Sequence, residues 1–226
     1  GFGIVSPIIK TKLTPLEIGN SNDVDLDDTL LILPSPQKGI GSMAEMVSRR
    51  PFVGWWEYFL EKPIYTLPMN QSWAGAPLIS SNGQILGVGS LFVQDAAFPG
   101  TFSPGNMFVP INLLKPILND LIKYGRRKKD VKPYIGISTN DSSGKVIITR
   151  VSKKGPAEKS GLKKNDIIKA VNGKAVNTVQ MFYKTIWSSG NYGVEIDFEI
   201  IRNEKDLSFK VKSVDRMDYL IKNKSY

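Results

Sequence analysis

Short apolar runs separated by turn-forming residues fill the first half of this 226-residue chain, and this pattern limits the folds that it can adopt. The expected strands are residues 4–5 with 8–9, 29–33, 77–79 and 85–89. Between the last two, Asn82-Gly83 is typical of a tight hairpin turn. Proline and glycine recur around these runs and favour long loops. The sequence therefore predicts an all-β barrel with long loops in this half.

A helix and a linker are predicted after the barrel. Residues 111–124 carry apolar side chains at helical spacing, with Pro116 in the first turns and Gly125 at the end. A compact basic cluster follows at residues 126–129, where we expect a solvated hinge within a linker of residues 126–132.

From Pro133 onward the pattern changes to a mixture of strands and helices. The expected order is a strand, a short helix, a strand, a longer helix and two strands. The short helix has Pro156 at its start and Gly161 at its end, and Asn177 or Thr178 can cap the longer one. Alternating apolar residues in 194–200 and 207–211 predict a final hairpin. This half therefore reads as a separate α+β domain.

Composition excludes several classes of site. The chain has no cysteine and no histidine, so disulfides, thiolate metal sites and the usual catalytic base are excluded within these residues. No metal-ligand cluster, carboxylate pair or phosphate loop stands out, and we expect neither a metal nor a cofactor. The net charge of +9 comes from lysines scattered over the second half, which we interpret as a solvated surface rather than a nucleic-acid site. No apolar run is long enough to predict a membrane span.

Residues 70–78, Asn-Gln-Ser-Trp-Ala-Gly-Ala-Pro-Leu, resemble the nucleophile loop of trypsin-like serine proteases of the HtrA/Deg type. The loop of that family reads Gly-Asn-Ser-Gly-Gly-Pro-Leu, which aligns Ala74 with the nucleophilic serine and Ser72 with the glycine whose amide helps to form the oxyanion hole. Trp73 and Ala76 also depart from the family pattern. Ala74 has no Oγ to attack a carbonyl, so the resemblance implies an inactive site.

The second half resembles the PDZ domain attached to these proteases. The resemblance depends on Tyr134-Ile-Gly-Ile137, on Gly155-Pro-Ala with Gly161-Leu162, and on Asp166-Ile-Ile with Val171-Asn-Gly173. It implies that backbone amides of the first motif bind a terminal carboxylate, and that residues 137–140 pair with an extended peptide. The implied peptide-binding residues are Tyr134, Ile135, Gly136, Ile137, Ser138, Val179, Phe182, Tyr183 and Ile186. Core packing is the alternative role for the last four.

The expected fold is mainly β: a trypsin-like barrel, equivalent to the second barrel of a chymotrypsin-type protease, followed by an α+β PDZ domain. The expected boundaries are an incomplete barrel domain over residues 1–125, a linker over 126–132, a PDZ domain over 133–213 and a C-terminal tail over 214–226. The barrel that carries the family's histidine and aspartate is expected to be missing or reduced to Gly1–Lys12.

The favoured function is that of an HtrA/Deg-like pseudoprotease of the periplasm or cell envelope, which binds peptides or protein C-termini. One alternative is a serine endopeptidase of protein quality control whose first barrel lies upstream and whose nucleophile was replaced by Ala74. A second alternative is a non-catalytic assembly scaffold, with copies of the chain as partners.

Overall fold

The computed structural model describes residues 2–9, 12–37, 39–141 and 144–222. The chain forms two compact units. The first unit contains Gly1–Phe52 and Leu60–Gly125, and the second contains Val53–Phe59 and Arg126–Tyr226. The short segment Val53–Phe59 is therefore part of the second unit, although the chain on both sides of it belongs to the first.

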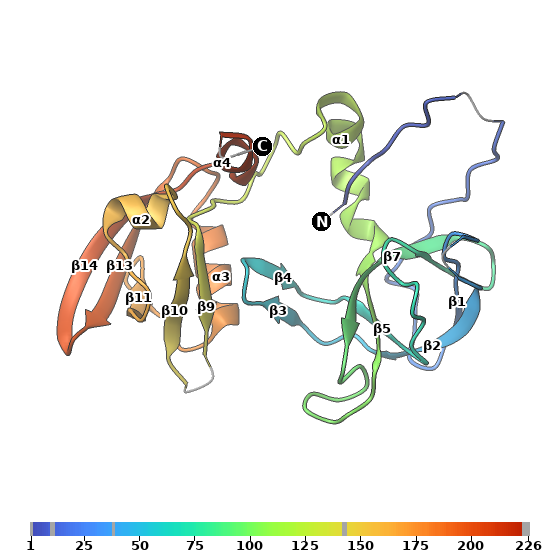
Figure 1. Cartoon of the computed structure of the whole chain (residues 1–226), viewed down its shortest axis with the longest axis horizontal. Helices are drawn as coiled ribbons and strands as arrows, with labels where there is room; N and C mark the ends of the chain where they lie inside the picture. Colours follow the sequence, from blue (N-terminus) through green and yellow to red (C-terminus); the bar gives the residue numbers. More distant parts are fainter. Residues whose placement is uncertain (1, 10–11, 38, 142–143, 223–226) are drawn as a thin grey trace. The chain divides into compact units, whose positions relative to one another are not determined.

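The first unit is a closed β-barrel (Figure 1). Its strand order is β1-β2-β5-β8-β7-β6. Its strands are β1 Thr29–Ile32, β2 Ser42–Ser48, β5 Ile64–Leu67, β6 Pro77–Ile79, β7 Ile85–Val93 and β8 Gly105–Pro110. All neighbouring pairs are antiparallel. Ile32, Ile64, Leu78 and Phe108 are fully buried inside the barrel. The prediction of a mainly β fold with a barrel is confirmed.

The hairpin predicted at Asn82-Gly83 joins β6 to β7. Gly83 has φ +79° and donates its amide to the carbonyl of Ser80 at 3.0 Å, so the turn depends on a residue that tolerates positive φ. Farther along β7, Gly89 allows another close approach. A Cβ on Gly89 would lie 1.8 Å from the carbonyl oxygen of Trp73, so only glycine lets residues 73–76 pack against this strand.

Two sequence expectations for the first unit are wrong. Residues 4–5 and 8–9 form no strand, and Val5 and Ile8 are exposed. Pro7 between them has no amide for a ladder. The helix expected at 111–124 begins instead as two 3-10 turns, Ile111–Leu113 and Lys115–Ile117, before α1 at Leu118–Tyr124. Pro116 lacks the amide that an α-helix would use, whereas Gly125 ends α1 with φ +65° as expected.

The second unit contains a sheet in the order β14-β13-β11-β10-β9, with β12 paired to β11. These strands are β9 Ile137–Asn140, β10 Val146–Val151, β11 Ile167–Val171, β12 Lys174–Ala175, β13 Glu195–Arg202 and β14 Lys205–Lys212. The helices are α2 Pro156–Ser160, α3 Val179–Ser188 and α4 Arg216–Lys222. The core contains residues from the sheet, from α2 and from α3. The remaining strands, β3 Phe52–Gly54 and β4 Tyr58–Leu60, form a separate two-stranded sheet (Figure 1).

The start of the predicted linker and the predicted tail interact with each other. Arg126 forms ion pairs with the buried carboxylate of Asp215 and, at 2.7 Å, with Asp218 on α4. Val214 exchanges two backbone hydrogen bonds, each 3.0 Å long, with Tyr134. The prediction of a solvated hinge is therefore wrong for Arg126, because its guanidinium is held by two carboxylates.

Candidate functional site

The turn that leads into β9 presents two backbone amides to one point. Gly136 has φ +79°, and its carbonyl accepts the amide of Ser152 at 2.8 Å. The carbonyl of Ile135 accepts the amide of Ala157 at 2.9 Å. These bonds, from residues beyond the turn, hold its carbonyls in place. They leave the amides of Gly136 and Ile137 directed away from the sheet ladder. Two amides in this arrangement form an oxyanion-binding concavity.

A carboxylate already lies in this concavity. Oε1 of Glu57 accepts the amide of Gly136 at 2.8 Å and that of Ile137 at 2.9 Å. The amide of Glu57 donates to the phenol oxygen of Tyr183 at 2.8 Å. Glu57, Gly136, Ile137 and Tyr183 all belong to the second unit. The turn therefore binds a carboxylate through backbone amides in this structure, and the carboxylate comes from the chain itself.

The environment of Glu57 favours its neutral form. Burial raises the pKa of its carboxyl group to about 7, although the two amides and the charge of Arg216 act in the opposite direction. Burial also raises the pKa of Tyr183 to about 12, so its phenol stays protonated. At neutral pH, Glu57 is thus close to the midpoint between its protonated and ionised forms.

Strand β9 and helix α3 flank the turn. In the sheet order β9 is the end strand and pairs only with β10, which leaves its other edge without a sheet partner among the described residues. Thr178 caps α3 by accepting the amide of Met181 at 3.1 Å. A cavity of about 400 Å³ lies between the end of β9 and the start of α3, and Val53, Gly54 and Trp55 also line it.

The structure brings together the nine residues predicted to bind peptide. Tyr134, Ile135, Gly136, Ile137 and Ser138 run through the turn into β9, and all five are buried. Val179, Phe182, Tyr183 and Ile186 lie on the inner face of α3 and are also buried, which is the core packing considered as their alternative role. Their role in peptide binding stays a prediction.

Sequence reasoning missed Glu57. It lies 79 positions before Gly136, and no periodicity connects a turn residue to a distant turn. The only local signal was the aromatic group around it, in which Trp56 stacks on Tyr58 with ring centroids 5.8 Å apart.

The protease-like loop in the first unit is tied down by its own polar groups. The amide of Ser72, at the position that resembles an oxyanion-hole donor, instead donates to Oδ1 of Asn70 at 2.8 Å. Ala74 is exposed, and Gly75 next to it has φ +75°. The loop thus keeps a sharp turn, while the amide of Ser72 is engaged within the loop.

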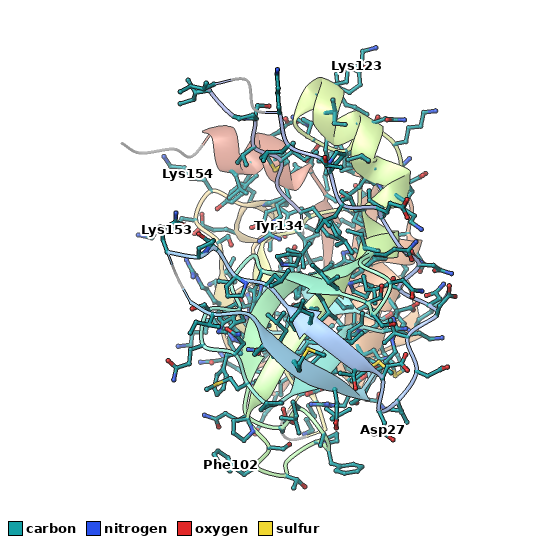
Figure 2. All side chains as sticks on the ribbon, turned by 90° about the vertical axis from the view of Figure 1, so that its right-hand side faces the viewer. Asp27, Phe102, Lys123, Tyr134, Lys153 and Lys154 are labelled. Atoms are coloured by element: carbon teal, nitrogen blue, oxygen red, sulfur yellow. The ribbon has the colours of Figure 1, made fainter. Side chains whose placement is uncertain are left out.

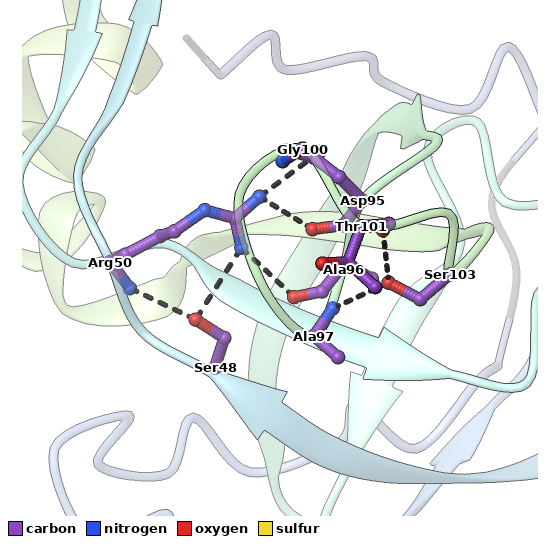
Figure 3. A network of polar contacts seen from close by, with 8 residues as sticks. All are labelled: Ser48, Arg50, Asp95, Ala96, Ala97, Gly100, Thr101 and Ser103. Carbon is purple, nitrogen blue, oxygen red and sulfur yellow. Dashed lines mark hydrogen bonds and ion pairs between the residues drawn. The ribbon is translucent and has the colours of Figure 1, made fainter.

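A second feature of the first unit is a long connection held by an arginine (Figure 3). Arg50 donates to the carbonyls of Asp95 at 2.7 Å and Ala96 at 2.9 Å, and its guanidinium lies 3.1 Å from the Asp95 carboxylate. The same guanidinium lies 4.1 Å from the ring centroid of Tyr65. These bonds fix the start of the β7–β8 connection, while Phe102 near its far end is exposed (Figure 2).

Among the described residues, no helix is both long enough and apolar enough to cross a membrane.

Comparisons with known proteins give matches to both halves. A family model described as PDZ domain matches residues 133–213. Serine protease Do-like HtrA of Bacillus subtilis is 28% identical over 164 residues, which cover 64% of this chain and 35% of that protein. Periplasmic pH-dependent serine endoprotease DegQ of Escherichia coli is 25% identical over 217 residues, which cover 89% of this chain and 46% of that protein. The chain therefore spans less than half the length of these relatives.

Solved structures show the same fold. HtrA-type protease AlgW with decapeptide matches with a TM-score of 0.61 and 17% identity, over 92% of this chain and 66% of that one. The serine endoprotease from Yersinia pestis matches with a TM-score of 0.56 and 20% identity, over 91% of this chain and 68% of that one.

Proposed function

Because this chain is an HtrA-like protein with a PDZ domain, we propose that it binds peptides or protein C-termini at the turn Tyr134–Ile137. The observation that carries the proposal is the pair of amides, Gly136 and Ile137, that hold a carboxylate oxygen at 2.8 and 2.9 Å. A peptide's terminal carboxylate has the same two oxygens, and its charge is that of the ionised form of Glu57. The edge of β9 that has no sheet partner in the described part of the chain gives the residues before that carboxylate a place to add as a strand.

We further propose that this chain binds without cutting. Ala74 has no nucleophilic atom, and the 226 residues include no histidine. The amide of Ser72 is engaged with Asn70. The names of the relatives, periplasmic serine endoproteases, favour an envelope location.

The binding proposal is tested with fluorescein-labelled decapeptides that end in Ala, Val, Leu or Phe. Each is made with a free C-terminal carboxylate and as the C-terminal amide, and affinity is measured by fluorescence polarisation. We expect the free acids to bind at least about tenfold more tightly, because the amide form loses a charge-assisted hydrogen bond. Equal binding of acids and amides would exclude the carboxylate site.

The names of the relatives also support a second candidate, a serine endopeptidase that receives its histidine and aspartate from outside these residues. Assays of casein cleavage distinguish the binding protein from the endopeptidase. They use this chain, its Ala74→Ser variant and the full-length product of the native gene, and we expect no cleavage from any of the three. Cleavage by the full-length product would overturn the non-cutting proposal, and the binding experiment would still test the peptide site.

A further inference from the structure

We infer that the segment Val53–Phe59 is a built-in occupant of the peptide groove, in which the Glu57 side chain takes the place of a peptide's terminal carboxylate. The inference rests on the proposed function, since it assigns a regulator to the same site. It makes the groove self-blocked, so that a peptide binds only when the segment leaves.

The competition follows from the number of donors. Gly136 and Ile137 each have one amide hydrogen, and both donate to the same atom, Oε1 of Glu57. A peptide carboxylate needs the same two hydrogens and the same space. The two carboxylates therefore exclude each other.

The segment contacts the rest of the second unit at several points besides the turn. The amide of Glu57 donates to Tyr183 on α3, and Phe59 packs beside Trp187 with ring centroids 6.2 Å apart. Val53 packs against the core and, with Gly54 and Trp55, lines the cavity at the end of β9. The segment thus follows both walls of the groove rather than touching it at one side chain.

Other features keep this contact weak enough to release. Glu57 has φ +57°, a left-handed conformation that costs a residue with a Cβ free energy. The two strands at the ends of the segment, β3 and β4, have only three residues each. A buried carboxylate gives up its hydration to stay in place. A ligand that competes with such an occupant binds with an affinity reduced by the fraction of open molecules.

The test is a Glu57→Asn variant. Asparagine is one methylene shorter, so it cannot reach both amides, yet it tolerates positive φ better than most residues. The matched control is Glu204→Asn, because Glu204 is also a glutamate with positive φ, at +62°, and is exposed on the β13–β14 turn. If one molecule in ten is open, Glu57→Asn should bind the free-acid decapeptides about tenfold more tightly, while Glu204→Asn should match the unaltered chain.

The outcomes separate this inference from the proposed function. Equal affinities of Glu57→Asn and the unaltered chain, with free acids still preferred, would overturn the self-blocked groove and leave the peptide site standing. Loss of the preference for free acids in every variant would overturn both.

A second measurement needs no variant. Saturating free-acid peptide should speed hydrogen exchange at the amide of Glu57, because its bond to Tyr183 breaks when the segment leaves. An unchanged exchange rate there, with peptide bound, would contradict the inference.

Discussion

Asn70 and Asn106 bond to each other in both directions inside the barrel. The amide of Asn70 donates to Oδ1 of Asn106 at 2.7 Å, and Nδ2 of Asn106 donates to the carbonyl of Asn70 at 3.2 Å. The Asn70 side chain, in turn, accepts the amide of Ser72 and donates to Ser42. A side chain on β8 therefore fixes the start of the protease-like loop.

Asn106→Ala should lower the free energy of unfolding of the first unit by about 2 to 4 kcal/mol. The substitution leaves a buried donor and a buried acceptor of Asn70 without partners, and each such group costs about 1 to 3 kcal/mol. Urea unfolding followed by tryptophan fluorescence measures the change. Asn82→Ala, on the exposed hairpin turn, is the control and should stay within about 0.5 kcal/mol of the unaltered chain. A loss below about 1 kcal/mol for Asn106→Ala would mean that the pair does not stabilise the loop.

In the second unit, Arg202 and Asp166 form a two-point pair. Nε and Nη2 of Arg202 donate to the two carboxylate oxygens at 2.6 and 2.7 Å, and Nη2 also donates to the carbonyl of Gly161 at 2.8 Å. The Asp166 side chain is 1% exposed. Arg202→Met should destabilise this unit by about 3 to 5 kcal/mol, because it strands a buried charge.

The control for that substitution is Lys210→Met, which removes a lysine paired with Glu195 on the exposed face of β14. A surface pair of this kind contributes about 0 to 1 kcal/mol. Chemical unfolding of both variants gives the comparison. Similar losses in the two variants would show that the burial of Asp166 does not set the stability of its pair.

Local patterns predicted much of the fold. Alternating apolar residues predicted the β13–β14 hairpin, in which Asn203 and Glu204 both adopt positive φ and form a two-residue turn. Pro156 and Gly161 marked the ends of α2, and Gly125 marked the end of α1. Each of these signals depends on residues only a few positions apart.

Distant polar pairs could not be predicted in the same way. Arg126 reads as one of four solvated basic residues, because its partner Asp215 lies 89 positions later. Nothing in the local sequence singles out Glu57, because its partners, Gly136 and Ile137, lie 79 and 80 positions away. The sequence therefore predicted one part of the candidate site, the turn Tyr134–Ile137, because it carries a recognisable motif. It did not predict that the Glu57 side chain binds to this turn.

Arg50 allows a test of what holds the β7–β8 connection in place, rather than of the stability of the whole first unit. Arg50→Met removes the donors to the carbonyls of Asp95 and Ala96, and a lost partner costs about 1 to 3 kcal/mol where the carbonyl is buried. Hydrogen exchange in residues 94–104 should therefore become roughly tenfold faster or more. Lys115→Met, at an exposed position of the same unit, should leave this loop unchanged. Protection of the loop that survives Arg50→Met would assign its order to other contacts, such as the bond from the Ala97 amide to Ser103.

The raised pKa of Glu57 predicts how the second unit responds to pH. The folded state holds this proton up to a pKa of about 7, against an ordinary value of 4.5, so it binds more protons than the unfolded state between these values. The stabilising contribution is thus complete below pH 4.5 and is lost as the pH rises through 7. One pKa unit corresponds to about 1.4 kcal/mol, so the unaltered chain should lose up to about 3 kcal/mol between about pH 4.5 and pH 8 from this group.

Glu57→Gln isolates this effect, because glutamine keeps an oxygen for the two amides and does not titrate. The charged and titratable groups that face Glu57 are Arg216 from α4, Tyr134 from the turn and Tyr183 from α3. Burial raises the pKa of both tyrosines above its ordinary value of 10, so neither group titrates below about pH 8. Urea unfolding of both proteins at several pH values gives the difference in stability, and it should shift in favour of the glutamine variant as the pH rises. Parallel curves from about pH 5 to pH 8 would show that the Glu57 proton is not linked to folding.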